Sequence, residues 1–165
     1  MDTGIMKLQE MLMILYIPAP EDLWFREEML ADPATMSYNH AYGGTIPFPR
    51  EKWAAWYDRW VKHPDGRRFY RYLMRQDGTF VGETAYRLDE ERGIYIADVI
   101  VLAKYRGQGC GRTGLELLCR AAKANGVDVL YDDIAADNPA VTLFLRCGFA
   151  EEYRTDEIIM LKKQL

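Results

Sequence analysis

The stretch that decides the fold is IYIADVIVLAKYRGQGCGRTGLELLCRAAKAN, residues 94–125. Its first part, 94–102, is mostly β-branched or aromatic, which predicts a strand. From Leu115 to Ala122, apolar residues recur at helical spacing with charged residues between them, which predicts an amphipathic helix. Three glycines and an arginine lie between these two elements, at 106–111. The uncovered amides and the dipole at the start of such a helix favour a bound anion, so the sequence predicts a phosphate-binding loop.

The same glycines can be compared with two other phosphate-binding loops. Residues 109–114 have the spacing of the dinucleotide-binding fingerprint, and Asp132 or Asp133 lies roughly 20 residues further on. That fold places its first glycine directly after the strand and needs several further βαβ units, for which too little chain remains. A nucleoside-triphosphate loop would need a lysine that the segment lacks. The glycine spacing alone keeps an NAD-dependent oxidoreductase as an alternative, although the position of the loop and the length of the chain argue against it.

A third pattern accounts for more of the chain. The order arginine-x-x-glycine-x-glycine at 106–111 follows a strand and opens a helix, and a run from Asp137 to Phe149 comes after the next strand. Residues 94–149 thereby resemble the GNAT family of N-acetyltransferases. The resemblance implies one α/β domain over residues 1–165, with a mixed, mostly antiparallel sheet of about seven strands flanked by helices on both faces. It also implies an acyltransferase that uses acetyl-CoA as co-substrate.

The resemblance also implies roles for particular residues. Backbone groups of 99–101 would bind the pantetheine arm and polarise the thioester carbonyl, and loop amides would hold the pyrophosphate. Asn138 would contact the cofactor from the start of a later helix, although Asp137 could take that place. The implied cofactor-binding residues are Val99, Ile100, Val101, Arg106, Gly107, Gln108, Gly109, Cys110, Gly111, Arg112, Asn138 and Phe144.

Amine acetylation needs a proton donor for the departing thiolate, and the usual donor is missing. Relatives often supply a tyrosine from the helix that follows the asparagine, but the matching position is Phe144, which has no proton to give. Tyr95, Tyr131 or Tyr153 could serve instead. Alternatively, the thiolate leaves without acid assistance, since the pKa of an ordinary thiol is only roughly 8.5.

The base that deprotonates the acceptor is also open. Relatives often carry a glutamate at positions that are Tyr95 and Ala97 here. Asp98 is the one acid inside this strand, and burial would raise its pKa towards the range of a useful base. Glu83, on the preceding strand, is the second catalytic candidate, and a water chain to a more distant carboxylate would require neither. An acyl-CoA sensor that kept the loop without catalysis is a further alternative.

Composition limits the partners. The chain has 165 residues, 21 Lys plus Arg, 25 Asp plus Glu and a formal net charge of −4, so we expect no nucleic-acid partner. No apolar run approaches the roughly 20 residues of a membrane span, and the first residues lack the features of a signal peptide, which favours a cytoplasmic protein. Cys110, Cys119 and Cys147 have no metal-type spacing and are expected as reduced thiols, with no metal. The expected acceptor is an amine of a small molecule or a protein, and a homodimer is a further option.

The N-terminal third predicts a strand at 11–17 and a helix over 23–30, with Asp22 as its N-cap and Arg26 in solvent. Residues 34–49 have no period, so they predict an irregular loop that either gates substrate or simply connects. A helix over 52–63 follows, and its aromatic face suits core packing, an interface or an acceptor pocket. The rings on that face are Trp53, Trp56, Tyr57 and Trp60.

Two strands of a hairpin lead into the central stretch, and three elements follow it. The predicted ranges are 67–75 and 79–88 for the hairpin, 127–134 for a strand parallel to that at Ile94, 138–147 for a helix, and 149–153 with 156–163 for a closing antiparallel pair. Three antiparallel strands before the glycine loop favour the acetyltransferase resemblance over a doubly wound dinucleotide fold.

Overall fold

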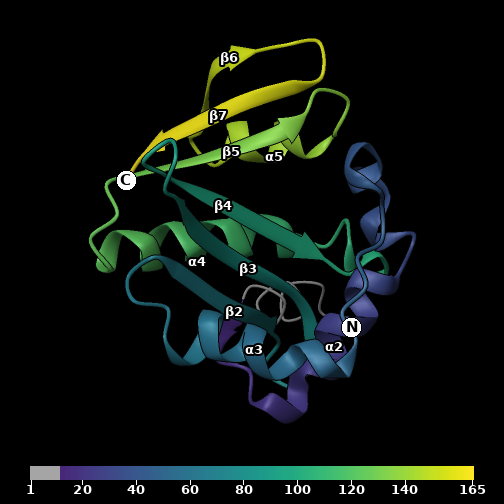
Figure 1. The fold of residues 1–165 in the computed structure, drawn as a ribbon. Coiled ribbons are helices and arrows are strands. Elements are labelled where there is room, and N and C mark those ends of the chain that lie inside the picture. The colour runs from purple at the N-terminus through teal and green to yellow at the C-terminus, as the bar shows by residue number, and fades with distance from the viewer. Residues whose placement is uncertain (1–11) are drawn as a thin grey trace.

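The computed structural model describes residues 12–165, leaving aside the side chains of residues 41 and 42. These residues form one sheet of seven strands in the order β1-β2-β3-β4-β5-β7-β6 (Figure 1). Every neighbouring pair is antiparallel except β4 and β5, which run parallel. The strands are β1 (Ile14–Tyr16), β2 (Arg68–Met74), β3 (Phe80–Asp89), β4 (Ile94–Val101), β5 (Val129–Ala135), β6 (Ala150–Arg154) and β7 (Ile158–Gln164). The predicted mixed, mostly antiparallel sheet is confirmed.

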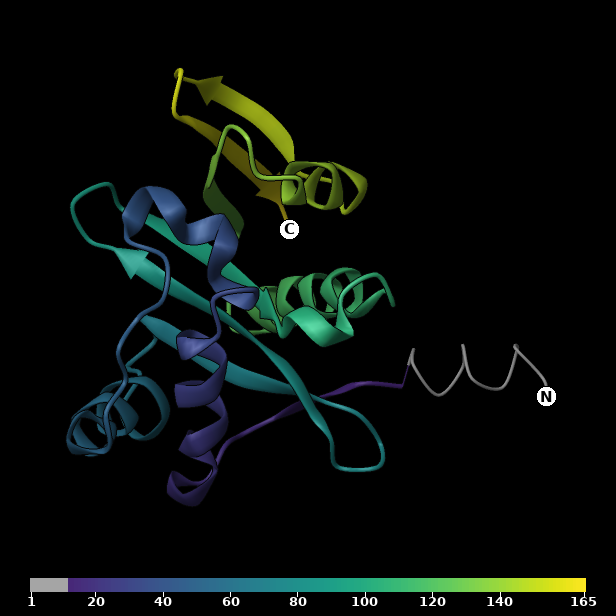
Figure 2. The ribbon, with the colours of Figure 1, turned by 90° about the vertical axis from the view of Figure 1, so that its right-hand side faces the viewer.

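Helices cover both faces of this sheet, as predicted. Figure 2 shows α4 and α5 on one side and α2 and α3 on the other. Helix α4 carries the amphipathic stripe, and α5 follows β5 along the chain. The helices are α2 (Leu23–Ala31), α3 (Trp53–Tyr57), α4 (Cys110–Ala124) and α5 (Ala140–Arg146).

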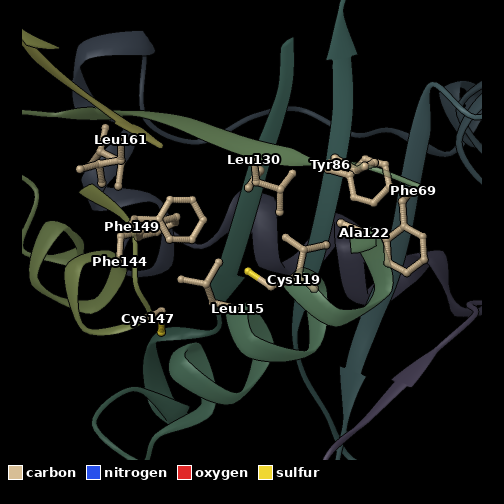
Figure 3. Close-up of a cluster of buried hydrophobic side chains, with 14 of the residues drawn as sticks. Phe69, Tyr86, Leu115, Cys119, Ala122, Leu130, Phe144, Cys147, Phe149 and Leu161 are labelled. Carbon is tan, nitrogen blue, oxygen red and sulfur yellow. The ribbon is translucent and has the colours of Figure 1, made fainter. Parts of the chain in front are cut away.

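The apolar stripe of α4 packs on the sheet as its spacing predicted. Leu115, Leu118 and Ala122 are fully buried against β-strand residues such as Leu130 (Figure 3). Phe144 of α5 and Phe149 close the same cluster. Phe149 lies directly before β6, and the two phenylalanine rings meet edge to face with centroids 5.0 Å apart. This cluster packs α4, which begins at the glycine loop, and α5 against the sheet.

The parallel pair β4 and β5 is joined over a short length only. The paired residues are Tyr95 with Leu130 and Ile96 with Tyr131, all near the start of the two strands. Beyond Ile96 the strands separate, which Figure 1 shows on the side of the glycine loop. Strand separation leaves the backbone groups of β4 that face β5 without a paired strand, although β3 stays paired on the other side, so a ligand can reach them.

The N-terminal third departs from several predictions. The first strand spans only Ile14–Tyr16, and residue 11 of the predicted range lies outside the described residues. Asp22 precedes α2 as its N-cap residue but makes no side-chain cap bond. Its carboxylate instead accepts hydrogen bonds from the Ala19 amide and the Tyr16 hydroxyl, at 2.9 and 2.7 Å. Asp22 therefore fixes the turn before the helix rather than the first turn of the helix.

The segment 34–49 is more regular than predicted, and the helix predicted over 52–63 is divided into shorter pieces. Within the first lies a 3-10 segment, η2 (Thr35–Tyr42), so this part of the chain is not irregular throughout. The predicted helix 52–63 divides into α3 and a π-turn, η4 (Asp58–Lys62), preceded by a 3-10 turn, η3 (Arg50–Lys52). Its rings pack against β2 and α2 of the same chain: Trp53, Trp56, Tyr57 and Trp60. The aromatic face therefore packs in the core of the chain, as one of the three predicted roles required.

Two further predictions concerned the state of the cysteines and a membrane-spanning segment. All three cysteines are buried, and Cys119 and Cys147 are free thiols. Burial raises the pKa of both of these thiols, which keeps them protonated. Among the helices within residues 12–165, none combines the length and the apolar character that crossing a bilayer requires.

Candidate active site

The glycine loop has the backbone geometry that its composition predicted. Gly107 and Gly109 adopt φ of +76° and +84°, in the left-handed region that side chains with a Cβ disfavour. Gly109 is the N-cap residue of α4, and within the described part of the chain no side chain caps the first turn. The positive end of the α4 dipole thus faces the loop, where it can stabilise a bound phosphate.

A cleft of 630 Å³ opens beside this loop. The loop forms one wall, the start of α5 forms the opposite wall, and η2 contributes a third side. Gly111 keeps the walls close, because a Cβ there would come within 3.1 Å of Leu143 Cδ2 on α5. Three arginines line the cleft, Arg106, Arg112 and Arg146. The exposed helix start and these cations fit the pyrophosphate of a coenzyme A thioester, and we call this space the cofactor cleft.

Not every predicted cofactor residue faces this cleft. Gly107, Gly109, Cys110, Gly111, Arg112 and Val101 line it, whereas Val99 and Ile100 line the neighbouring cleft described below. The Gln108 side chain is turned away from it, because its Oε1 accepts a hydrogen bond of 2.6 Å from Arg75.

Arg106 lines the cofactor cleft, but its guanidinium has protein partners. Nη1 and Nη2 donate to the carbonyl oxygens of Ala34 and Thr35, at 3.1 and 2.5 Å. The Thr35 hydroxyl, fully buried, donates to Asp32 and accepts from the Ala103 amide at 2.9 Å. Arg106 and Thr35 together tie the start of η2 to the loop, so Arg106 shapes the cleft wall as well as carrying charge.

The start of α5 is arranged by Asn138 and Asp137. The Asn138 Oδ1 accepts a hydrogen bond of 2.9 Å from the Ala140 amide, which fixes the turn into the helix. Asp137 instead pairs with His40 of η2, with Nε2 and Oδ2 3.1 Å apart. Both residues of this exposed pair line the cofactor cleft. His40 therefore connects η2 to the opposite wall, a role that its position in the sequence did not reveal.

A second cleft, of 340 Å³, lies where β4 and β5 separate. Its wall carries four carboxyl groups, from Glu83, Asp98, Asp132 and Asp133, and the rings of Trp56, Trp60, Tyr70 and Tyr86. We call it the acidic cleft. It adjoins the cofactor cleft, because Tyr38, Asn138 and Ala140 line both.

Glu83 is held inside the protein rather than on a solvated strand face. Its side chain is only 2% exposed, it accepts a short hydrogen bond from the Tyr70 hydroxyl, and its Oε2 lies 3.6 Å from Arg26 Nε. Arg26, predicted to be in solvent, is only 16% exposed and lies between rings, with its guanidinium 4.7 Å from the Phe48 ring and 4.6 Å from the Trp56 ring. The pKa of Arg26 is raised: burial lowers it, and the Glu83 carboxylate more than offsets this. Glu83 therefore already has a hydroxyl and a cation as partners.

Asp98 differs from Glu83 because it makes no hydrogen bond or ion pair with any described residue. Its carboxyl faces the acidic cleft and reaches water there, although protein atoms surround the cleft. Burial first and the Glu83 charge second raise its pKa to about 7, against the opposing effects of Arg26 and Arg87. The pKa of Asp132 is raised well above its usual range by burial and by the Asp98 and Asp133 charges. Asp98 is thus a carboxyl that can accept a proton near neutral pH.

Phe144 lines the acidic cleft and is buried, so the position of the usual acid carries only a hydrocarbon ring there. The tyrosines that the sequence offered as alternative donors line neither cleft: Tyr95, Tyr131 and Tyr153. Sequence reasoning missed Tyr38 as a wall residue, as well as the contributions of Arg26, Asp132 and Arg146. Tyr38 lies in the segment 34–49, whose lack of period was the one signal for it.

A model of the acetyltransferase (GNAT) family matches residues 22–149, which is most of the chain. The chain belongs to the acetyltransferase (GNAT) family. It is an acetyl-CoA-dependent N-acetyltransferase, with acetyl-CoA supplying the acetyl thioester. The oxidoreductase alternative is wrong, because β2, β3 and β4 are antiparallel and precede the loop.

Solved structures share the fold of this GNAT chain. A putative acetyltransferase from Acinetobacter baylyi is 18% identical with a TM-score of 0.76, each chain being covered over 93%. A spermidine N-acetyltransferase from Vibrio cholerae, in complex with CoA and spermine, is 19% identical with a TM-score of 0.74, over 92% of this chain and 95% of that one. A ribosomal-protein-alanine N-acetyltransferase from Brucella melitensis is 24% identical with a TM-score of 0.71, over 92% and 99%. No curated protein sequence matches the chain.

Proposed function

We propose that this GNAT enzyme transfers the acetyl group of acetyl-CoA to a primary amine that enters the acidic cleft as a cation, by direct attack while both substrates are bound. The observation that carries the proposal is the junction of the two clefts, because one fits a coenzyme A thioester and the other presents Glu83, Asp98 and Asp132. An ammonium group would lower the repulsion among these carboxylates and gain their attraction.

Within this proposal, Asp98 acts as the base. An ammonium must lose a proton before its nitrogen can attack, and a carboxyl with a pKa of about 7 can take that proton near neutral pH. Glu83 is the weaker candidate because Tyr70 and Arg26 already engage its carboxylate. We expect kcat/KM to fall about tenfold per pH unit below pH 7, as Asp98 becomes protonated.

Residues 99–101 and the helix start position acetyl-CoA in this proposal. Val101 lines the cofactor cleft and Val99 the acidic cleft, so the end of β4 passes from one to the other. Backbone N–H groups of this segment on the side of β5, where β4 has no paired strand beyond Ile96, would polarise the thioester carbonyl. Loop amides, Arg112 and Arg146 would hold the pyrophosphate.

An acceptor screen tests this function. Acetyl-CoA would be incubated with the enzyme and a panel of amines, with products followed by mass and free thiol followed optically. The spermine complex of the Vibrio cholerae neighbour and the alanine acceptor of the Brucella melitensis neighbour make polyamines and alanine N-termini the first compounds to try. We expect acetylation of an amine that carries at least one positive charge, and loss of about a hundredfold in kcat for Asp98→Asn.

The sensor alternative predicts a different result in the same screen. Phe144, which replaces the usual acid, is the observation in its favour. A sensor would bind coenzyme A, measured as a rise in melting temperature, yet release no thiol with any amine.

Acetylation of anionic or neutral amines alone would contradict the acidic-cleft assignment while leaving the family activity intact.

A further inference from the structure

The junction of the two clefts limits which residues can touch the reacting sulfur. The thioester must lie within reach of the acceptor nitrogen, so its carbon and sulfur belong where the cofactor cleft meets the acidic cleft. Three residues line both clefts, Tyr38, Asn138 and Ala140. Any side chain that hands a proton to the departing sulfur directly should be among them.

Only one of these three residues carries a transferable proton. Ala140 has none, and the Asn138 side chain is an amide whose oxygen is already bound to the Ala140 amide. Tyr38 has a phenolic hydroxyl, which can both donate and accept. Its hydroxyl makes no hydrogen bond to any described residue, so it remains available to a ligand.

The segment that carries Tyr38 is anchored at both ends to the cofactor cleft. On one side, Arg106 holds the carbonyl oxygens of Ala34 and Thr35. On the other, His40 contacts Asp137 beside the start of α5. Tyr38 lies between these anchors and packs against the apolar cluster of α2 and α3. Its ring is therefore positioned by the loop and by α5, the two elements that would hold the cofactor.

We propose that Tyr38 is the proton donor to the departing thiolate of coenzyme A, in place of the tyrosine that Phe144 replaces. This inference rests on the proposed function. Asp98 first takes a proton from the acceptor ammonium. As the new C–N bond forms and the C–S bond breaks, the sulfur keeps the electron pair of the broken bond and receives the Tyr38 proton. The Tyr38 phenolate then regains a proton from the nitrogen, which must lose one to become an amide, so protons and charge balance.

The surroundings of Tyr38 keep its hydroxyl protonated before the reaction. Burial, followed by the charges of Asp98, Glu83 and Asp132, raises the pKa of Tyr38, and Arg106 opposes this. A cationic acceptor would offset those three carboxylates, which makes the hydroxyl a better acid when the substrate is bound. The same carboxylates that attract the acceptor thus link its binding to the readiness of the donor.

Kinetics of Tyr38→Phe provide the first test. The substitution keeps the ring and its packing but removes the proton. We expect kcat to fall about a hundredfold while KM for acetyl-CoA changes less than about threefold, because the hydroxyl acts in the transition state. Tyr153→Phe is the matched control, since Tyr153 is exposed on β6 and lines neither cleft. Equal kcat values for Tyr38→Phe and the wild-type enzyme would overturn the proposal.

A spectroscopic readout separates this role from a structural one. The enzyme would carry 3-fluorotyrosine at position 38, and its ¹⁹F resonance would be followed while coenzyme A or desulfo-coenzyme A is added. We expect a larger shift with coenzyme A, because only that ligand places a sulfur beside the hydroxyl. Identical shifts with both ligands, or none with either, would overturn the assignment. Neither titration requires an acceptor, so a failure of the acceptor screen alone would contradict the proposed function and leave this result standing.

Discussion

Asp98 should cost the enzyme stability in return for its basicity. A carboxyl whose pKa is higher in the folded than in the unfolded chain binds more protons when folded, so the free energy of unfolding falls as pH rises between the two pKa values. For Asp98 these values are 3.8 and about 7. The cost begins near pH 4 and is complete above pH 7. Replacing the acid by a neutral isostere, Asp98→Asn, removes it.

The size of this effect follows from the same shift. A difference of about three pKa units corresponds to a ceiling of about 4 kcal/mol, at 1.36 kcal/mol per unit. The Asp98 carboxyl faces the acidic cleft and reaches water, which screens the charges around it, so we discount this ceiling to about 1 to 2 kcal/mol. For a chain of this length, that gain raises the melting temperature by about 3 to 6 °C at pH 8.

Urea unfolding at pH 4, 6 and 8 would measure the effect, with thermal unfolding as a second probe. The Asn variant should gain stability over the wild-type enzyme as pH rises, while its activity is lost. Asp128→Asn is the control for the loss of an exposed acid outside both clefts, and its measured effect at each pH would be subtracted from that of Asp98→Asn. A gain for Asp98→Asn that does not depend on pH, or a loss at pH 8, would refute the assignment of a raised pKa.

Three further substitutions test other parts of the structure. Gly109→Val forces a β-branched residue into φ of +84° at the start of α4, so we expect the Kd for coenzyme A, measured by calorimetry, to rise at least about tenfold; unchanged affinity would contradict the loop assignment. Arg26→Met leaves a buried carboxylate without its cation and removes a charge that lowers the pKa of Asp98, so stability should drop by about 3 kcal/mol and the acid limb of the kcat/KM profile should move to higher pH. Gly114→Ala places a Cβ 2.6 Å from Leu73 Cδ1, and urea unfolding should show a loss of about 1 to 2 kcal/mol with coenzyme A affinity retained.

The elements nearest the glycine loop could be predicted because their signals are local. The strand at Ile94 and the helix from Cys110 have clear periodicity, and Gly107 and Gly109 need the left-handed backbone that other residues disfavour. Arg26 was placed wrongly because helical spacing puts it beside two acids on an apparent polar face. Its charged partner inside the protein is Glu83, more than fifty positions away along the chain.

By itself, the sequence determined the order of elements and the glycine turn between strand and helix, because both follow from residue type and short spacing. The family resemblance placed Phe144 where relatives often carry a tyrosine. Only the tertiary structure decided which charges and hydroxyls share a space. Asp98 and Asp132 line the same cleft where β4 separates from β5, and the anchoring of η2 brings Tyr38 to the cofactor cleft. Chemistry at this site depends on distances between residues that are far apart in the chain, and local sequence preferences carry no information about those distances.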